Sequence, residues 1–176
     1  MALPAVDAQV FFPRRTHAHD PRRIVMPTAH APSLAKVLRA LSFLARHVAG
    51  VSLVTYGPPP QRRVPVPHTH LASFSPPERA QLYSDCGLFV YLDSHDRQPV
   101  YEAMACGAPV IAVSGGEPFL RHGENCWLVS PLLGLNELVR ALHRVLSDSA
   151  LQNRLSEGAH GTFGVARLFA RWEPPD

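Results

Sequence analysis

The chain has 176 residues, of which 46% are hydrophobic and 18% are charged, and its formal net charge is +3. This composition provides enough apolar material for one folded domain and excludes a largely disordered chain. The basic excess is small and no nucleic-acid-binding module accompanies it, so no nucleic-acid partner is expected.

Hydrophobic periodicity predicts strands that alternate with helices along the chain. Residues 1–22 are rich in proline and arginine and show no periodicity, so we expect them to form an extended linker. The elements predicted next are a strand at 23–26, a helix at 33–48, a strand at 51–56, a loop at 58–68 and a strand at 70–74.

The alternation continues through the second half of the chain. Ser75 and Glu78 form a capping-box pattern, which predicts a helix that ends near residue 84. Ser149 is expected to cap the last helix. The elements predicted between these two helices are a strand at 87–92, a helix at 99–106, strands at 109–113 and 127–129, and a helix at 135–147.

This order of elements indicates an α/β fold, a Rossmann-like three-layer α/β/α sandwich with a mostly parallel sheet. We expect the domain to cover residues 23–160, after the linker 1–22 and before a C-terminal tail at 161–176. Sheets of this kind bind ligands at the carboxyl ends of their strands. The loops expected at that edge are 27–33, 57–69, 93–99 and 114–118.

A polar loop, a short helix, a buried strand and a glycine pair follow one another in the middle of the chain. The N-terminus of the helix favours an anion, and Arg97 and Gln98 stand there as further donors. Glu102 lies about one turn into the helix, where its carboxylate can accept hydrogen bonds from hydroxyls. Gly115 and Gly116 allow close approach of a ligand to the backbone. The pattern suits a ligand with phosphates and sugar hydroxyls, although an ordinary strand–helix–strand unit would also produce it.

The segment Tyr101–Ile111 strongly resembles the signature of the group 1 glycosyltransferases, retaining nucleotide-sugar enzymes of GT-B fold. The resemblance covers about residues 3–157, which correspond to the C-terminal, donor-binding domain. Further segments that resemble the family are Leu3–Asp7 and Phe12–Pro13 in the interdomain linker, Leu82–Val90 before the signature, and Gly115–Glu117, Arg121–Asn125 and Trp127–Val129 after it.

The resemblance implies a two-domain enzyme whose C-terminal domain binds a nucleotide-sugar donor. The N-terminal domain, which this chain does not resemble, would bind a glycan or lipid-linked acceptor in glycan or glycolipid synthesis. The family usually needs no cofactor and no metal ion, because protein groups neutralise the leaving diphosphate. Peripheral membrane association of a full-length protein would fit a lipid-linked acceptor. We expect the isolated chain to transfer no sugar.

The match to the family's site residues is partial. Glu102 takes the position of the family's second glutamate, which holds the nucleotide ribose hydroxyls. Ser94 stands where the first glutamate would contact the donor sugar, and Asp93 or Asp96 replaces it if the loop is shifted. The glycine loop is a residue or two shorter than the family's, so Glu117 is a candidate and not a definite equivalent of the family's loop glutamate.

The family's arginine and lysine that grip the diphosphate are also absent at their usual places. Pro27 and Pro32 stand there, and proline provides neither a charge nor an N–H group. His30, Lys36 and Arg97 are the candidate replacements.

The resemblance and the loop positions together predict a donor site. The ribose is expected at Glu102, the diphosphate near Arg97 and Gln98, and the base near the loop 57–69. The sugar is expected toward Ser94–Asp96 and the glycine pair. No residue is assigned a catalytic role, and the predicted donor-binding residues are Glu102, Ser94, His95, Asp96, Arg97, Gln98, Gly115, Gly116, Glu117, Gly57 and His30.

Two other functions compete with this interpretation. A non-catalytic nucleotide-binding or scaffold domain with a degenerate donor site would explain the departures from the family pattern. A dinucleotide oxidoreductase is disfavoured, because no G-x-G-x-x-G follows the first strand. Phe163, Phe169 and Trp172 are expected either to contact the missing N-terminal domain or to pack locally.

The remaining features predict a soluble, cytoplasmic bacterial protein without a metal site. No apolar run approaches the roughly 18 residues of a membrane-spanning helix, and the first residues do not resemble a signal peptide. Two histidine pairs, at 17 and 19 and at 68 and 70, lie in expected loops without further converging ligands. The cysteines cannot all pair, which fits a reducing compartment, and buried structural thiols are expected at Cys86, Cys106 and Cys126.

Overall fold

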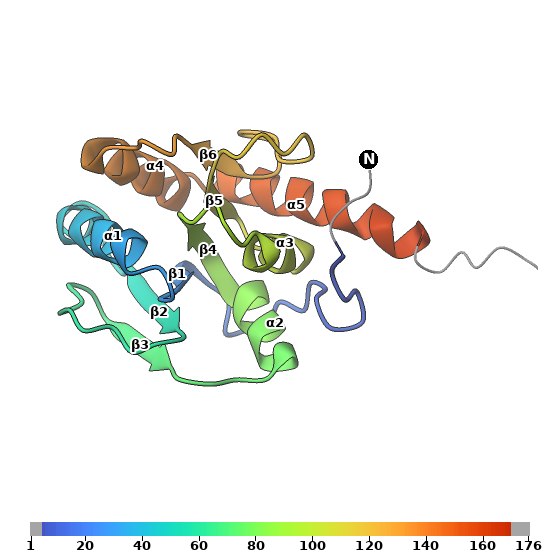
Figure 1. Ribbon diagram of the computed structural model, residues 1–176, viewed down its shortest axis with the longest axis horizontal. Helices are drawn as coiled ribbons and strands as arrows, with labels where there is room; N and C mark the ends of the chain where they lie inside the picture. The colour runs from blue at the N-terminus through green and yellow to red at the C-terminus, as the bar shows by residue number, and fades with distance from the viewer. Residues whose placement is uncertain (1–4, 170–176) are drawn as a thin grey trace, which may run out of the picture.

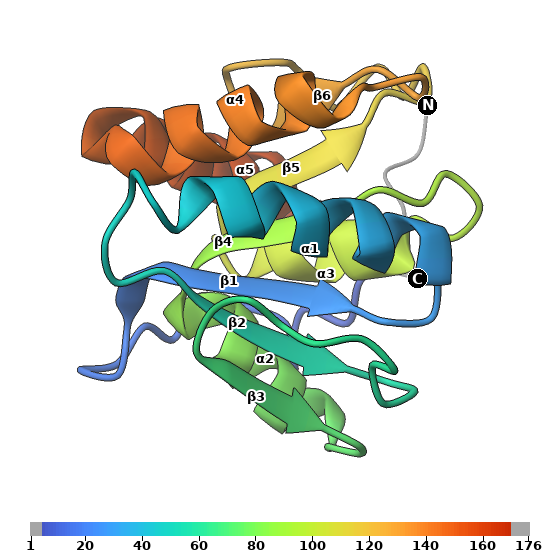
Figure 2. The same ribbon diagram turned by 90° about the vertical axis from the view of Figure 1, so that its left-hand side faces the viewer.

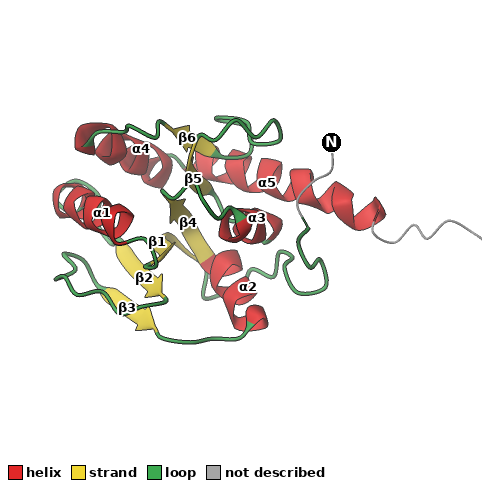
Figure 3. Ribbon diagram, viewed as in Figure 1, coloured by secondary structure: helices red, strands yellow, loops and turns green. Residues whose placement is uncertain are grey.

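The computed structural model describes residues 5–169, which form a six-stranded sheet between two layers of helices (Figure 1 and Figure 3). The strands are β1 (Asp20–Pro27), β2 (Ser52–Tyr56), β3 (His68–Leu71), β4 (Cys86–Tyr91), β5 (Val110–Val113) and β6 (Trp127–Val129). The helices are α1 (Ala31–Leu44), α2 (Pro76–Asp85), α3 (Gln98–Ala105), α4 (Leu135–Ser147) and α5 (Ser149–Phe169).

The strand order is β3-β2-β1-β4-β5-β6, and every neighbouring pair is parallel. The chain builds the sheet outward from β1 to β3 and then returns to add β4 to β6 on the other side of β1. This topology confirms the predicted Rossmann-like α/β fold. Because the order reverses between β1 and β4, the carboxyl ends of these two strands are where such a sheet opens a ligand-binding crevice.

The sheet is buried on both faces by two separate apolar cores. Successive strand residues point to opposite faces, so Ile24 and Met26 pack with α1 and α4, whereas Val25 packs with α2 and α3. Figure 2 shows α1 and α4 together in front of the sheet. Burial on both faces explains why the strands are continuous apolar runs instead of alternating polar and apolar residues.

Element boundaries differ from the prediction at three places in the first half of the chain. β1 begins at Asp20, inside the predicted linker, because Asp20 pairs with Cys86 of β4. α1 ends at Leu44 instead of residue 48, because the chain tightens into a turn there, where the amides of Arg46 and His47 donate to carbonyls three residues back at 3.3 and 2.9 Å. β3 begins at His68, before the predicted 70–74, because that residue pairs with Leu53 of β2.

The last helix also differs from the prediction. The carboxylate of Asp148, and not Ser149, accepts a hydrogen bond from the amide of Leu151 at 2.9 Å and so caps α5. α5 continues to Phe169, through part of the predicted tail. Phe163 is buried with its ring 6.0 Å from that of Tyr101, so this side chain packs locally. The predictions for the side chains of Phe169 and Trp172 lie outside the described residues.

The three cysteines are buried free thiols, as predicted. Burial raises the pKa of each thiol to about 12. The thiols therefore stay protonated near neutral pH, and the protonated form is a poor nucleophile.

The N-terminal segment is attached to the domain through Asp85, at the end of α2. The carboxylate of Asp85 accepts hydrogen bonds from the amide and the hydroxyl of Thr16, at 2.7 and 2.8 Å, and from the side chain of Gln81 at 2.7 Å. Burial opposes ionisation of this carboxyl, but these hydrogen bonds outweigh it and lower the pKa of Asp85. Phe11, which precedes Thr16 in the same segment, is buried in the core beside α3.

We predict that acid releases this attachment. A carboxyl whose folded pKa is depressed stabilises the fold above its unfolded pKa, and the contribution is lost as pH falls through the lower folded value. Hydrogen exchange at the Thr16 amide should therefore accelerate as pH falls below the usual range for aspartate, after correction for the intrinsic rate. Asp85→Asn should cost about 2 kcal/mol at neutral pH and remove this acid dependence. The same acid-induced opening in Asp85→Asn would assign the effect to another group.

Candidate functional site

A small cavity lies where the order of the sheet reverses. It has a volume of about 170 Å³ and lies at the carboxyl ends of β1 and β4. Its polar lining residues are His30, Ser33, Tyr56, Tyr91, Asp93 and Asp96. No lysine or arginine is among the described residues that line it, so the cavity presents hydroxyls, an imidazole and two carboxylates.

His30 brings its ring to this cavity from the start of α1. It is the residue that precedes the helix, and its Nδ1 lies 2.5 Å from the Ser33 hydroxyl. Pro27 lines the same cavity. Lys36, a sequence candidate for the phosphate grip, lies one turn further along and donates to the Leu133 carbonyl at 2.9 Å. Of these two candidates, only His30 lines the cavity.

The polar loop after β4 is organised by its own aspartates. Asp93 accepts hydrogen bonds from the amide and the ring of His95, at 3.0 and 2.8 Å, and the amide hydrogen bond is the main cause that lowers the pKa of Asp93. Asp96 accepts from the amide of Gln98 at 3.0 Å. The carboxylate of Asp96 therefore occupies the α3 N-terminus, where we expected the diphosphate from the sequence. Ser94 and His95 are exposed to solvent.

Arg97 is buried and turns away from the helix opening toward the end of β5. Its Nη2 donates to the Val113 carbonyl at 2.6 Å, and its Nε lies 2.9 Å from Oε1 of Glu117 as an ion pair. The other oxygen of Glu117 is buried and has no hydrogen-bond partner. A Cβ at Gly115 would lie 2.7 Å from this oxygen, so the close approach of the pair requires glycine there. Gly116 follows, exposed, with φ of 83°.

We predict that Gly115→Ala displaces the Arg97–Glu117 pair without unfolding the protein. The backbone φ at Gly115 is not positive, so alanine fits the backbone, and the atoms that it would meet are ends of side chains. The free energy of unfolding should fall by about 1 kcal/mol or less. Donor affinity, measured by calorimetry, should fall roughly tenfold if this pair contacts the donor. Unchanged donor affinity with a displaced pair would remove Arg97 and Glu117 from the donor site.

Glu102 is buried between α2 and α3. Its carboxylate lies 3.2 Å from Nε of Arg79, and the side-chain amide of Gln98 donates to it at 3.5 Å. Burial raises the pKa of Glu102, and the charge of Arg79 opposes that rise. The sequence did not identify Arg79 as a site residue. The sequence feature that could have identified Arg79 is its place in the first turn of the capping-box helix. The N-terminus of this helix faces the carboxyl ends of the strands, as the other site residues do.

Gly57 ends β2 at the same edge. Its φ is 102°, a conformation that favours glycine, and a Cβ there would lie 3.2 Å from the Thr28 hydroxyl. This hydroxyl donates to the carbonyl of Tyr56 at 2.9 Å and so ties the ends of β1 and β2 together.

The predicted site residues therefore form three neighbouring groups. His30, Asp93 and Asp96 line the cavity between β1 and β4. The second group, at the end of β5, contains Arg97, Gly115 and Glu117. The third, between α2 and α3, contains Gln98 and Glu102, which Arg79, a residue not predicted from the sequence, joins. Ser94, His95, Gly57 and Gly116 surround these groups on loops at the same edge.

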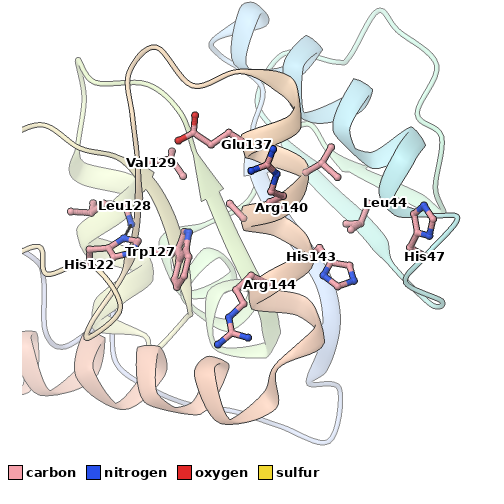
Figure 4. Close-up of a pocket in the computed structure, with 12 residues that line it drawn as sticks. Leu44, His47, His122, Trp127, Leu128, Val129, Glu137, Arg140, His143 and Arg144 are labelled. Atoms are coloured by element: carbon pink, nitrogen blue, oxygen red, sulfur yellow. Dashed lines mark hydrogen bonds between the residues drawn. The ribbon is translucent and has the colours of Figure 1, made fainter.

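A larger hollow of about 630 Å³ lies elsewhere, along α4 and β6 (Figure 4). The side chain of Trp127 comes from β6 and those of Arg140 and Arg144 come from α4. His122 packs on Trp127 with ring centroids 4.5 Å apart. None of the sequence-predicted donor residues lines this hollow, so size alone does not identify the candidate site.

The described residues contain neither a membrane-spanning helix nor a metal-binding cluster. Among residues 5–169, no helix is both long and apolar enough to cross a bilayer. Over the same residues, no group of three or more histidine, cysteine, aspartate and glutamate side chains could hold a metal ion. His68 and His70, one of the two histidine pairs, both contact the Thr55 hydroxyl, at 2.8 and 3.0 Å.

The fold and the site define a class of protein: a Rossmann-like domain with carboxylates, a buried arginine and a glycine loop at the carboxyl edge of its sheet. A family model described as glycosyl transferases group 1 matches residues 27–148, more than half of the chain. The chain therefore belongs to the group 1 glycosyltransferases, and its fold is that of the C-terminal domain of GT-B enzymes. The resemblance seen in the sequence is confirmed.

Relatives agree with this assignment. The O-antigen biosynthesis protein RfbC of Myxococcus xanthus is 30% identical in an alignment of 169 residues, which covers 89% of this chain and only 13% of that protein. The C-terminal domain of LpcC, a group 1 glycosyl transferase of Francisella tularensis, has a TM-score of 0.76 at 18% identity, with 93% of this chain and 98% of that chain covered. HepE of Anabaena, solved with UDP-glucose, has a TM-score of 0.60 at 17% identity, with 86% and 49% covered. At such low identities the two structures show the fold alone.

Proposed function

We propose that this chain is the donor-binding domain of a retaining glycosyltransferase that moves a sugar from a nucleotide diphosphate sugar to an acceptor. The proposal rests on Glu102, a buried carboxylate within the family's signature that stands beside the ligand-binding edge of the sheet. The reaction would take place in the bacterial cytoplasm, in glycan or glycolipid synthesis, as the name of the Myxococcus relative suggests.

Glu102 is suited to hold the ribose hydroxyls of the donor. An ionised carboxylate can accept about four hydrogen bonds, and the contacts from Arg79 and Gln98 are at 3.2 Å or longer. A vicinal diol can therefore add two short hydrogen bonds to this carboxylate. Arg79 would keep the carboxylate ionised and oriented.

The sugar would lie toward the cavity and the glycine loop. Asp93 and Asp96 offer carboxylate oxygens in the cavity, and Glu117 has a buried oxygen without a hydrogen-bond partner. Buried carboxylate oxygens are normally hydrogen-bonded, so an unpartnered one favours a ligand hydroxyl. This arrangement supplies acceptors for a sugar with several hydroxyl groups.

The diphosphate would lie between these two regions, near Gln98 and Arg97, with the base toward the loop 57–69. Charge on the leaving diphosphate must be neutralised by protein groups, because we propose that neither a metal ion nor a cofactor takes part. The acceptor would come from an N-terminal domain across the cleft. We therefore propose that the isolated chain binds the donor but transfers no sugar.

A second candidate function is a non-catalytic nucleotide-binding or scaffold domain. The observation that favours it is the charge of the cavity, where the described lining residues include two aspartates and no lysine or arginine. Asp96 at the α3 N-terminus and the engaged guanidinium of Arg97 also weaken diphosphate binding. Losing one such stabilising charge costs about 3 kcal/mol in comparable sites.

Calorimetry with UDP-, GDP- and ADP-sugars distinguishes donor binding from a scaffold role without a bound nucleotide. Donor binding predicts heat for one nucleotide class, and UDP-glucose is the first ligand to test because HepE was solved with it. A scaffold domain predicts no binding by any donor in a sample shown to be folded. Sugar transfer to common acceptors by the isolated chain would contradict the proposal that transfer requires an N-terminal acceptor domain.

A further inference from the structure

Charge is unevenly distributed along the chain. Residues 21–77 contain seven lysine and arginine residues and no aspartate or glutamate. The rest of the chain holds ten basic and fourteen acidic residues, so its charge of −4 and the +7 of this segment give the net +3. The segment forms β1, α1, β2 and β3, which make up one side of the domain. The small net charge therefore hides a strongly basic side.

Part of this basic segment forms one outward surface. Arg39, Phe43 and Arg46 recur at four- and three-residue spacing along α1 and the turn that follows it, which places them on one face. The connection between β2 and β3 runs beside α1 (Figure 2). Its Arg62 and Arg63 line a hollow together with Arg39. We call these five residues the basic face.

The hollow has a volume of about 400 Å³ and a mixed lining. Ala35, Leu38 and Pro65 supply apolar surface, while the guanidinium groups supply hydrogen-bond donors. Phe43 follows the lining residue Ser42 in the chain and has 49% of its surface exposed, one of two large hydrophobic residues in the described part of the chain that are exposed to this degree. Apolar surface and cations are thus presented together.

The cations of the basic face have no partners in the described part of the chain. Arg39, Arg46, Arg62 and Arg63 are exposed, and their guanidinium groups make no ion pair there. In contrast, Arg121 pairs with Glu124 and Arg144 with Asp148 on the other side of the domain. Unpaired guanidinium groups that cluster on one surface attract an anion from outside.

We propose that the basic face docks the domain onto an anionic lipid bilayer. Arginines would contact the phosphates of the headgroups, and Phe43 would insert its ring at the boundary with the acyl chains. The proposal is independent of the donor site, because the basic face and the cavity at the strand ends share no lining residue.

The lining favours lipid over another polyanion. A single-stranded nucleic acid requires a groove with several aromatic side chains for successive bases, and this surface has one. An exposed phenylalanine on the face of α1 that also carries arginines matches an amphiphile whose charged group and apolar chains are adjacent.

Flotation with vesicles tests the proposal. The full chain should float with equimolar phosphatidylglycerol and phosphatidylcholine but not with phosphatidylcholine alone, and high salt should release it. Each basic residue near such a surface contributes about fivefold to partitioning, so Arg62→Glu with Arg63→Glu should weaken binding at least about 25-fold. Phe43→Ser should weaken it about tenfold with little change in salt dependence.

A matched control carries the same change of charge elsewhere. Arg140→Glu with Arg154→Glu alters two exposed arginines outside the basic segment and should retain most of the binding. Circular dichroism and thermal melting establish that each variant is folded. Equal flotation on neutral vesicles, no flotation at all, or equal loss in both double variants would overturn the proposal. So would binding of a short RNA or inorganic phosphate through Arg62 and Arg63 without vesicle binding.

Discussion

Replacing Glu102 with alanine is expected to weaken binding of the nucleotide-sugar donor by roughly 100-fold. Hydrogen bonds to a charged acceptor contribute about 1.5–3 kcal/mol, and the proposed ribose contact uses two of them. Glu102→Gln keeps one acceptor oxygen and should retain an intermediate affinity. Calorimetry on the wild type, Glu102→Ala and Glu102→Gln with the same donor gives the ratios of their donor affinities.

The control for this prediction is Glu157→Ala, which removes an exposed carboxylate on α5 and should leave donor affinity unchanged. Donor binding should also weaken in acid. Burial raises the pKa of Glu102, so protonation removes the acceptor at a higher pH than for an ordinary glutamate, and affinity falls as pH drops through that raised value. Wild-type affinity in Glu102→Ala would show that the nucleotide binds without this residue.

Replacing Gly87 with alanine is expected to destabilise the fold more than any other substitution considered above. Gly87 lies in β4, and a Cβ at this position would overlap the backbone carbonyl of Pro21 in β1. The side-chain amide of Gln152, from α5, donates to the carbonyls of both residues at 3.0 and 3.3 Å, so all three elements would have to move apart. The free energy of unfolding should fall by about 3 kcal/mol or more.

Thermal and urea unfolding measure this effect, which corresponds to a fall in the melting temperature of about 10 °C for a domain of this size. Gly134→Ala is the matched control. Gly134 has an ordinary φ of −79° and open space where a Cβ would be added, so its replacement should change stability by a few tenths of a kcal/mol. Equal stability of Gly87→Ala and wild type would mean that β1 and β4 do not approach this closely.

Local signals explain what could be predicted from the sequence. The capping box of Ser75 and Glu78 is formed as expected, since the Glu78 carboxylate accepts from the Ser75 amide at 2.7 Å. The helix at 135–147 also forms within its predicted bounds, because apolar residues at helical spacing mark it from end to end. Strand identity followed from apolar runs that are buried on both faces of a parallel sheet.

Contacts between distant residues explain what could not be predicted. Arg79 and Glu102 are separated by 23 residues and meet only because α2 and α3 pack side by side. Arg97 was expected to stand at the opening of α3 as a donor, but its guanidinium lies at the carbonyl of Val113 and the carboxylate of Glu117. Ser149 and Asp148 are both good helix caps, and only the backbone geometry selects the second.

The central claim is that the carboxyl edge of the sheet binds a nucleotide sugar. Titration of UDP-glucose, or of the donor that calorimetry selects, into ¹⁵N-labelled protein tests it most directly. The account predicts shifted amide resonances at residues 28–30, 93–98 and 114–117 and at Glu102, with little change along α4. No shifts in a folded sample for any donor, or shifts confined to the hollow around Trp127 and Arg144, would contradict it.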